Sequence, residues 1–159
     1  LDIPLSSSSP LPLPSYQQKQ RSVAIMYYQN VCTVSYSFAF WDWYHWERHL
    51  DWMAMQGINT PLAFTGQEYV WSKTLYEFGF NSSDLQTFFA GPAFYAWQRM
   101  GNMQGWGGPL RESEIMGQYN IQIQILARMN TFEMNPALTC FAGHVPKTFI
   151  NIYPNASVI

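Results

Sequence analysis

Hydrophobic and polar residues change their spacing several times along this chain, and each change predicts a different element. Residues 23–40 are rich in β-branched and aromatic side chains and contain neither Gly nor Pro, which predicts one or two strands. Further on, apolar residues recur at i, i+4 and i+7, the spacing of one helix face. These residues are Trp46, Leu50 and Met53. Asp42 is the predicted N-cap of this helix, with Glu47 in its early turns, and Gly57 is the predicted stop.

Glycine and proline divide the next stretch into short elements. Residues 58–64 form an apolar run, but Pro61 inside the run weakens a strand prediction. The pattern then favours a helix over residues 67–78 that is stopped by Gly79. The cluster at residues 81–84 marks the start of another helix, because it holds Asn, Ser and Asp before an apolar run.

A second break follows at Gly91-Pro92, where Pro92 suits the first turn of a helix over residues 93–100. Residues 101–109 hold four Gly and one Pro, which predicts a loop with Trp106 in its middle.

The stretch from 111 to 132 has two competing interpretations. Ile alternates with Gln over residues 121–125, which indicates a strand. A helical stripe is also present, formed by Ile115, Tyr119, Ile123, Leu126 and Met129. We favour the helix because of the length of the stretch and the helix formers at residues 126–129. Residues 136–141 then predict a buried strand, ended by Gly143.

The order of these elements predicts an α/β fold with a parallel sheet, because strands alternate with helices. A complete (β/α)₈ barrel takes roughly 250 residues, and the chain has 159. We therefore expect a partial (β/α)₈ TIM barrel made of the first three or so βα units. Residues 22–159 form the expected domain, and the Ser- and Pro-rich residues 1–21 are expected to be a low-complexity, extended or disordered lead-in. Three parallel strands leave two open edges, which predicts poor stability.

Composition adds a first indication of function. Hydrophobic residues make up 48% and aromatic residues 18%, whereas charged residues make up only 11%, against roughly 25% in an ordinary domain. Either a large core or an aromatic ligand surface, such as a sugar site, explains these values, and the two are compatible. The net charge of −2 gives no electrostatic case for nucleic acid or an anionic membrane. The sequence contains no apolar run of membrane-spanning length.

Candidate chemistry outside the aromatic residues is sparse. The two cysteines, Cys32 and Cys140, make no disulfide framework, and with the three His residues they fit no zinc pattern. We therefore expect no metal. Two Asn-x-Ser sequons begin at Asn81 and Asn155, and they are candidate glycosylation sites.

Several ordered, tryptophan-rich segments carry a family resemblance over residues 27–154. They are Tyr27-Tyr28-Gln29-Asn30-Val31-Cys32-Thr33, Trp41-Asp42-Trp43, Gly66-Gln67-Glu68, Phe89-Ala90-Gly91-Pro92-Ala93-Phe94 and Phe141-Ala142-Gly143-His144-Val145-Pro146. They resemble the N-terminal part of the TIM-barrel domain of the α-N-acetylglucosaminidase family. Two departures stand out: Thr139-Cys140 stands where the family usually has Pro-Ala, and Glu133 replaces an expected Gly.

The resemblance implies a retaining glycoside hydrolase that removes terminal α-linked N-acetylglucosamine from a carbohydrate, as in heparan sulfate degradation, without a cofactor. It also implies a lysosomal or secreted location, although no signal peptide is visible in this chain. In the family two glutamates on later barrel strands perform catalysis. We therefore expect no catalytic residue here and a fragment that is inactive alone. A non-catalytic sugar-binding remnant and a truncated product without function are the alternatives.

The resemblance further implies five substrate-binding residues, which are Asn30, Cys32, Tyr36, Trp97 and Met100. For Cys32 and for the Trp97–Met100 pair, ordinary core packing is the competing interpretation. Glu68 is rejected as a nucleophile in favour of a supporting hydrogen bond or a helix N-terminal charge. His144 is read equally as a functional loop residue or a structural turn residue.

Overall fold

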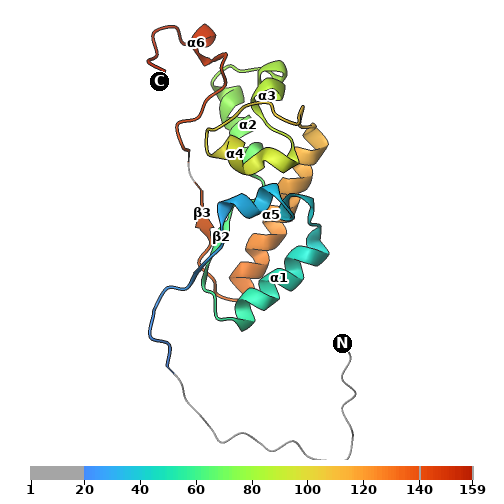
Figure 1. The fold of residues 1–159 in the computed structure, drawn as a ribbon, viewed down its shortest axis with the longest axis vertical. Coiled ribbons are helices and arrows are strands. Elements are labelled where there is room, and N and C mark those ends of the chain that lie inside the picture. The colour runs from blue at the N-terminus through green and yellow to red at the C-terminus, as the bar shows by residue number, and fades with distance from the viewer. Residues whose placement is uncertain (1–19, 140, 159) are drawn as a thin grey trace, which may run out of the picture.

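The computed structural model describes residues 20–139 and 141–158, and a small parallel sheet lies to one side of its helices (Figure 1). Its strands are β1 (Tyr27–Tyr28), β2 (Thr60–Ala63) and β3 (Ala137–Leu138), in the order β1-β2-β3. Both neighbouring pairs are parallel, so the predicted α/β class with a parallel sheet is confirmed. The lead-in predicted over residues 1–21 lies almost wholly outside the described residues.

The strand predicted over residues 23–40 is wrong for most of its length. Only Tyr27–Tyr28 forms a strand, and two 3₁₀ helices follow it. These are η1 (Val31–Ser35) and η2 (Phe38–Phe40). The turn begins at Asn30, because its side-chain oxygen accepts a hydrogen bond from the backbone N–H of Cys32 at 2.7 Å and caps η1. Val34 and Phe38 of these helices are buried in the core, whereas Tyr36 and Phe40 are exposed, and none of them pairs with a neighbouring strand.

Helix α1 (Trp43–Met55) confirms the predicted amphipathic helix. Asp42 is its N-cap, with its carboxylate accepting the backbone N–H of His45 at 3.1 Å. The chain leaves the helix through Gly57, whose φ of +73° is a conformation that glycine adopts without strain. The predicted face is buried, with Trp46, Leu50 and Met53 each at most 1% exposed.

Strand β2 lies in the middle of the sheet although it contains Pro61, so the doubt that Pro61 raised about this strand is corrected. Thr60 donates its backbone N–H to the carbonyl of Met26 on the β1 side, which puts the missing N–H of Pro61 on the β3 side. Leu62 pairs with Ala137, so the residues that precede them, Pro61 and Pro136, lie opposite each other. Neither proline has a donor, and the pairing with β3 starts at the next residue, Leu62.

The segment between β2 and β3 is helical. Its first elements are α2 (Gln67–Glu77), α3 (Ser82–Phe88), η3 (Pro92–Phe94) and α4 (Tyr95–Arg99). The helix predicted to begin at residues 81–84 does so with a capping box, because Asn81 and Asp84 each bind the other's backbone N–H. The helix predicted over residues 93–100 is shorter than expected, since its first turn is 3₁₀.

The ambiguous stretch is the helix α5 (Glu112–Thr131), as favoured from its length. The buried face matches the predicted stripe only in part: Met129 of the stripe is 0% exposed, but Ile123 is 50% exposed, and Ile125 outside the stripe is 1% exposed. The strand predicted over residues 136–141 is shorter and more open than expected, because β3 has two residues and Leu138 is 63% exposed. A short helix, α6 (Phe149–Ile152), follows it.

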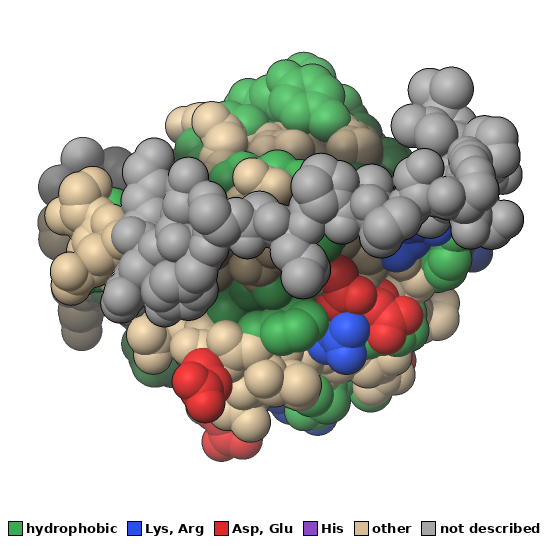
Figure 2. Space-filling view, turned by 90° about the horizontal axis from the view of Figure 1, so that it is seen from below, with side chains coloured by type: hydrophobic (Ala, Val, Ile, Leu, Met, Phe, Trp, Pro, Cys, Tyr) green, Lys and Arg blue, Asp and Glu red, His purple; other side chains and the backbone are tan. Residues whose placement is uncertain are grey.

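The helices α1 and α5 lie side by side next to the sheet (Figure 1). Arg128 of α5 binds Asp51 of α1 at 2.7 Å, and Gln122 donates to the carbonyl of Ala63 in β2 at 3.3 Å. Two βα units thus pack as layers, with a core of aliphatic and aromatic side chains between them. On the face in Figure 2, hydrophobic and uncharged side chains predominate, and acidic and basic side chains lie together near the middle.

Candidate functional site

The residues predicted to bind a ligand lie where η1 meets α4. Segment η1 follows the carboxyl end of β1, and α4 packs directly against it (Figure 1). Ser35 fixes the contact, because its hydroxyl oxygen accepts the backbone N–H of Ala96 at 2.7 Å in a buried position. In parallel α/β folds, residues at the carboxyl ends of strands are the ones that reach a ligand.

Two of the five predicted residues are in direct contact. The rings of Tyr36 and Trp97 meet edge to face, with their centroids 5.9 Å apart. Tyr36 is 64% exposed, and Trp97 is half-buried. These residues are 61 positions apart in sequence, so the pairing depends on the packing of η1 against α4. The exposed aromatic surface is suited to the apolar face of a ring-shaped ligand.

The other three predicted residues flank this pair on the same two elements. Asn30 is exposed, and because its Oδ1 atom caps η1, its Nδ2 amide is the part of the side chain that can donate to a ligand. Cys32 is a half-buried free thiol within η1. Met100 is the C-cap of α4 and is 43% exposed. The five residues therefore lie on two adjoining elements, which we call the η1–α4 wall.

Behind the wall, a buried ion pair connects α4 to α2. Glu68 binds Arg99 through both carboxylate oxygens, each at 2.7 Å, and the two side chains are 3% and 7% exposed. The Nη1 atom of Arg99 also donates to the carbonyl of Phe64 at 2.9 Å, just beyond the end of β2. A carboxylate held in this way is not poised to attack a substrate, which agrees with the supporting role expected for Glu68.

Arg99 also lies over the ring of Tyr95, 4.8 Å from its centroid. Burial raises the pKa of the Tyr95 hydroxyl, and the negative charge of Glu68 raises it further. Tyr95 is therefore neutral at physiological pH. Its ring completes the packing around the ion pair, so α4 is held by charge, hydrogen bonds and aromatic contact together.

His144, one of the residues left open by the sequence, packs as a neutral aromatic ring. Its ring lies 5.0 Å from that of Phe88 and 6.3 Å from that of Trp71. Burial lowers the pKa of His144, so its uncharged form is favoured at neutral pH. These contacts join the chain after β3 to α2 and α3, which supports the interpretation of a structural turn residue.

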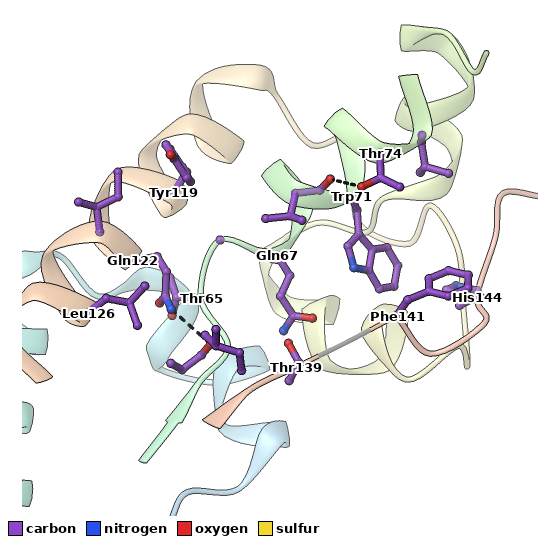
Figure 3. A pocket seen from close by; sticks show the side chains of 16 residues that line it. Thr65, Gln67, Trp71, Thr74, Tyr119, Gln122, Leu126, Thr139, Phe141 and His144 are labelled. Carbon is purple, nitrogen blue, oxygen red and sulfur yellow. Dashed lines mark hydrogen bonds between the residues drawn. The ribbon is translucent and has the colours of Figure 1, made fainter. Parts of the chain in front are cut away.

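His144 also borders a groove of about 560 Å³ between α2, α5 and the chain after β3. Figure 3 shows Gln67, Trp71, Tyr119, Leu126 and Phe141 around it. The lining is mainly apolar and includes none of the five predicted residues. This groove is therefore separate from the η1–α4 wall, where polar and aromatic side chains lie together.

Residues 20–139 and 141–158 contain neither a metal-binding cluster nor a membrane-spanning helix. This part of the chain brings no three His, Cys, Asp or Glu residues together in a way that could hold a metal ion. Its helices are all too short or too polar to cross a membrane.

The sequence did not reveal the partners that hold the wall in place. Arg99 and Glu68 are 31 residues apart, and Ser35 and Ala96 are 61 apart. Charged residues are scarce in this chain, and a buried charge needs a partner, so the sequence indicated only that Glu68 and Arg99 would each be paired.

Comparison with known proteins places these features in context. The family model described as the tim-barrel domain of alpha-N-acetylglucosaminidase matches residues 26–159. Human alpha-N-acetylglucosaminidase is 48% identical over 132 residues, which are 83% of this chain and 18% of the human protein. The chain thus spans less than a fifth of the length of this relative.

Solved structures of a bacterial relative give the same result in three dimensions. The family 89 glycoside hydrolase from Clostridium perfringens, in complex with 2-acetamido-1,2-dideoxynojirimycin, matches with a TM-score of 0.82 and 40% identity. The match covers 86% of this chain and 15% of that protein. A form of the Clostridium perfringens enzyme bound to its substrate, GlcNAc-alpha-1,4-galactose, matches with a TM-score of 0.81 and the same identity and coverage.

Proposed function

This chain belongs to the alpha-N-acetylglucosaminidase family, and from that premise we propose that its η1–α4 wall binds terminal α-linked N-acetylglucosamine. The observation that carries the proposal is the edge-to-face contact of Tyr36 and Trp97 at the carboxyl end of the sheet. A relative with a TM-score of 0.81 binds GlcNAc-alpha-1,4-galactose, which supports this class of ligand. The wall is then part of the site of a glycoside hydrolase.

Each residue of the wall has a role suited to this sugar. The indole face of Trp97 stacks on the apolar face of the pyranose ring, and the hydroxyl of Tyr36 bonds a sugar hydroxyl. The Nδ2 amide of Asn30 donates to a second hydroxyl. Met100 packs beside the N-acetyl methyl group, and Cys32 closes the wall at its half-buried end.

Hydrolysis itself needs groups that we do not assign within this chain. A retaining glycosidase uses two carboxyl groups about 5–5.5 Å apart, one of which protonates the leaving oxygen. Glu68 is committed to Arg99 in a buried pair, so it is unsuited to either role. We propose that the catalytic glutamates belong to other parts of a larger (β/α)₈ barrel, of which these residues form the first units. The expected result is no turnover of a chromogenic α-N-acetylglucosaminide by the 159-residue chain.

A titration with 2-acetamido-1,2-dideoxynojirimycin, followed by ligand-observed NMR, tests the binding proposal. We expect saturable binding to the chain, and we expect Trp97→Ala to weaken it at least about tenfold by removing the stacking surface. Trp52→Ala is the matched control, because Trp52 is an exposed tryptophan on α1, outside the wall. The proposal is wrong if the chain does not bind the compound or if both variants weaken it equally.

The cellular route is part of the same proposal. A lysosomal or secreted location, with glycans at Asn81 and Asn155, is consistent with the exposure of both asparagines. In α3 the Oδ1 atom of Asn81 makes the helix cap, which leaves Nδ2 for a glycan. Ser83→Ala removes this sequon and keeps the helix cap, which uses only the backbone N–H of residue 83. Mass spectrometry should therefore show one glycan fewer on this variant than on the unchanged protein.

A further inference from the structure

The pair formed by Tyr36 and Trp97 is one end of a longer aromatic row. The ring of Trp97 lies 6.5 Å from that of Phe94, and Phe94 lies 6.0 Å from Trp106. Together with the 5.9 Å between Tyr36 and Trp97, this makes four rings in continuous contact. Both ends of the row are open, because Tyr36 is 64% and Trp106 is 60% exposed.

The loop that carries Trp106 is fixed in place from two sides. On one side, the carbonyl oxygen of Trp106 accepts a hydrogen bond from the backbone N–H of Gly91 at 2.8 Å. A Cβ atom on Gly91 would collide with the carbonyl oxygen of Gly107. The lack of a side chain at Gly91 is therefore what allows the loop to approach so closely. On the other side, Gln104 donates to the carbonyl of Val145 at 2.8 Å.

Two features make Trp106 suited to bind a ligand. Its backbone is already ordered, so binding costs little additional conformational entropy. Its large apolar face remains open beside an adjoining binding surface, although tryptophan is ordinarily among the highly buried residues. A pyranose ring is similar in size to one aromatic ring, so a row of four rings offers more surface than a single sugar covers.

We propose that Trp106 forms a second sugar-binding position, which takes the hexopyranose joined to the terminal N-acetylglucosamine. This inference rests on the proposed function, because Trp97 and Tyr36 must hold the terminal sugar. The apolar face of the second ring stacks on the indole of Trp106, and the indole N–H donates to a hydroxyl of that ring. Phe94 lies between the two positions as a continuous apolar floor.

The test compares a monosaccharide with a disaccharide on the full 159-residue chain. N-acetylglucosamine fills only the first position, whereas GlcNAc-α-1,4-galactose fills both. We expect the disaccharide to bind about tenfold more tightly, as one stacked ring provides. Trp106→Ala should abolish this difference and leave the Kd for N-acetylglucosamine unchanged. Trp106→Phe should keep part of the difference, and Trp52→Ala should keep all of it.

Each outcome decides between the two proposals. Equal affinity for the two sugars, or a disaccharide affinity that Trp106→Ala leaves unchanged, overturns the second position while the first stands. If Trp106→Ala weakens both sugars equally, its effect is on the wall and the inference fails. If neither sugar binds, the proposed function falls and this inference falls with it.

Discussion

At the residue scale, the Glu68–Arg99 pair shows how a charge can be essential without touching a ligand. The pair is almost fully buried and makes three hydrogen bonds, counting the one to Phe64. Burying such a pair gains little net stability, but removing one partner leaves the other charge uncompensated. The pair therefore fixes where α4, and with it Trp97, can lie.

Glu68→Gln is accordingly expected to lower the free energy of unfolding by about 3 kcal/mol, since Arg99 would stay charged and buried. Asp51→Asn is the matched control, because it cuts the Asp51–Arg128 pair, whose side chains are 41% and 32% exposed. That change should cost less than about 1 kcal/mol. Urea unfolding followed by circular dichroism measures both. Similar losses in the two variants would contradict the special role of the buried pair.

Glu133, in contrast, is a residue whose backbone conformation is unfavourable for its side chain. It follows α5 with a φ of +54°, which is left-handed and outside the range that ordinary residues prefer. The backbone N–H of Met134 bonds to the carbonyl of Met129, as in a helix end that usually carries glycine at this point. The family resemblance also leads one to expect glycine there.

Glu133→Gly is expected to raise the free energy of unfolding by about 1 kcal/mol, because it relieves the left-handed strain. Glu133→Ala is the control, since it removes the charge and keeps the strain. Comparing the two variants by urea unfolding separates these effects. A gain from alanine as large as that from glycine would show that charge, and not backbone conformation, limits stability at this position.

At the element scale, the sequence predicted helices better than strands. Caps and stops such as Asp42, Gly57 and Asn81 act within a few residues, so their effect can be read locally. Strand β1 could not be read this way, because the cap at Asn30 turns the chain into 3₁₀ helices within a stretch of β-branched and aromatic residues. In the site, the resemblance supplied the five residues, whereas their partners on other elements came only from the fold.

Helix α5 illustrates the limit on a single element. Its sequence has two overlapping apolar stripes, and packing against α1 and β2 chooses the one that contains Ile125. Ile125→Ala should therefore cost about 2–4 kcal/mol, whereas Ile123→Ala, at a half-exposed position, should change stability by less than about 0.5 kcal/mol. Thermal and urea unfolding of the two variants check this order. The reverse order would restore the stripe predicted from sequence.

At the scale of the whole molecule, two histidines at separate places link stability to acidity. His49 is stacked on Trp52 with ring centroids 5.5 Å apart, and it also contacts Phe38 and Trp41. Burial lowers the pKa of His49, as it does for His144 beside Phe88. The folded state therefore resists protonation at both residues, while the unfolded state takes up protons near the ordinary value of about 6.5.

The consequence is a loss of stability as the pH falls from about 7 to about 5, because the unfolded chain binds protons that the folded chain excludes. The lowered carboxyl pKa values of Asp42 and Glu114 act mainly below about pH 5, under this window. His49→Phe keeps an aromatic ring in the cluster and removes the titration, so its unfolding midpoint should depend less on pH than that of the unchanged protein. Urea midpoints measured at several pH values across the window decide the matter: parallel curves for the two proteins would mean that burial of His49 does not control the acid response.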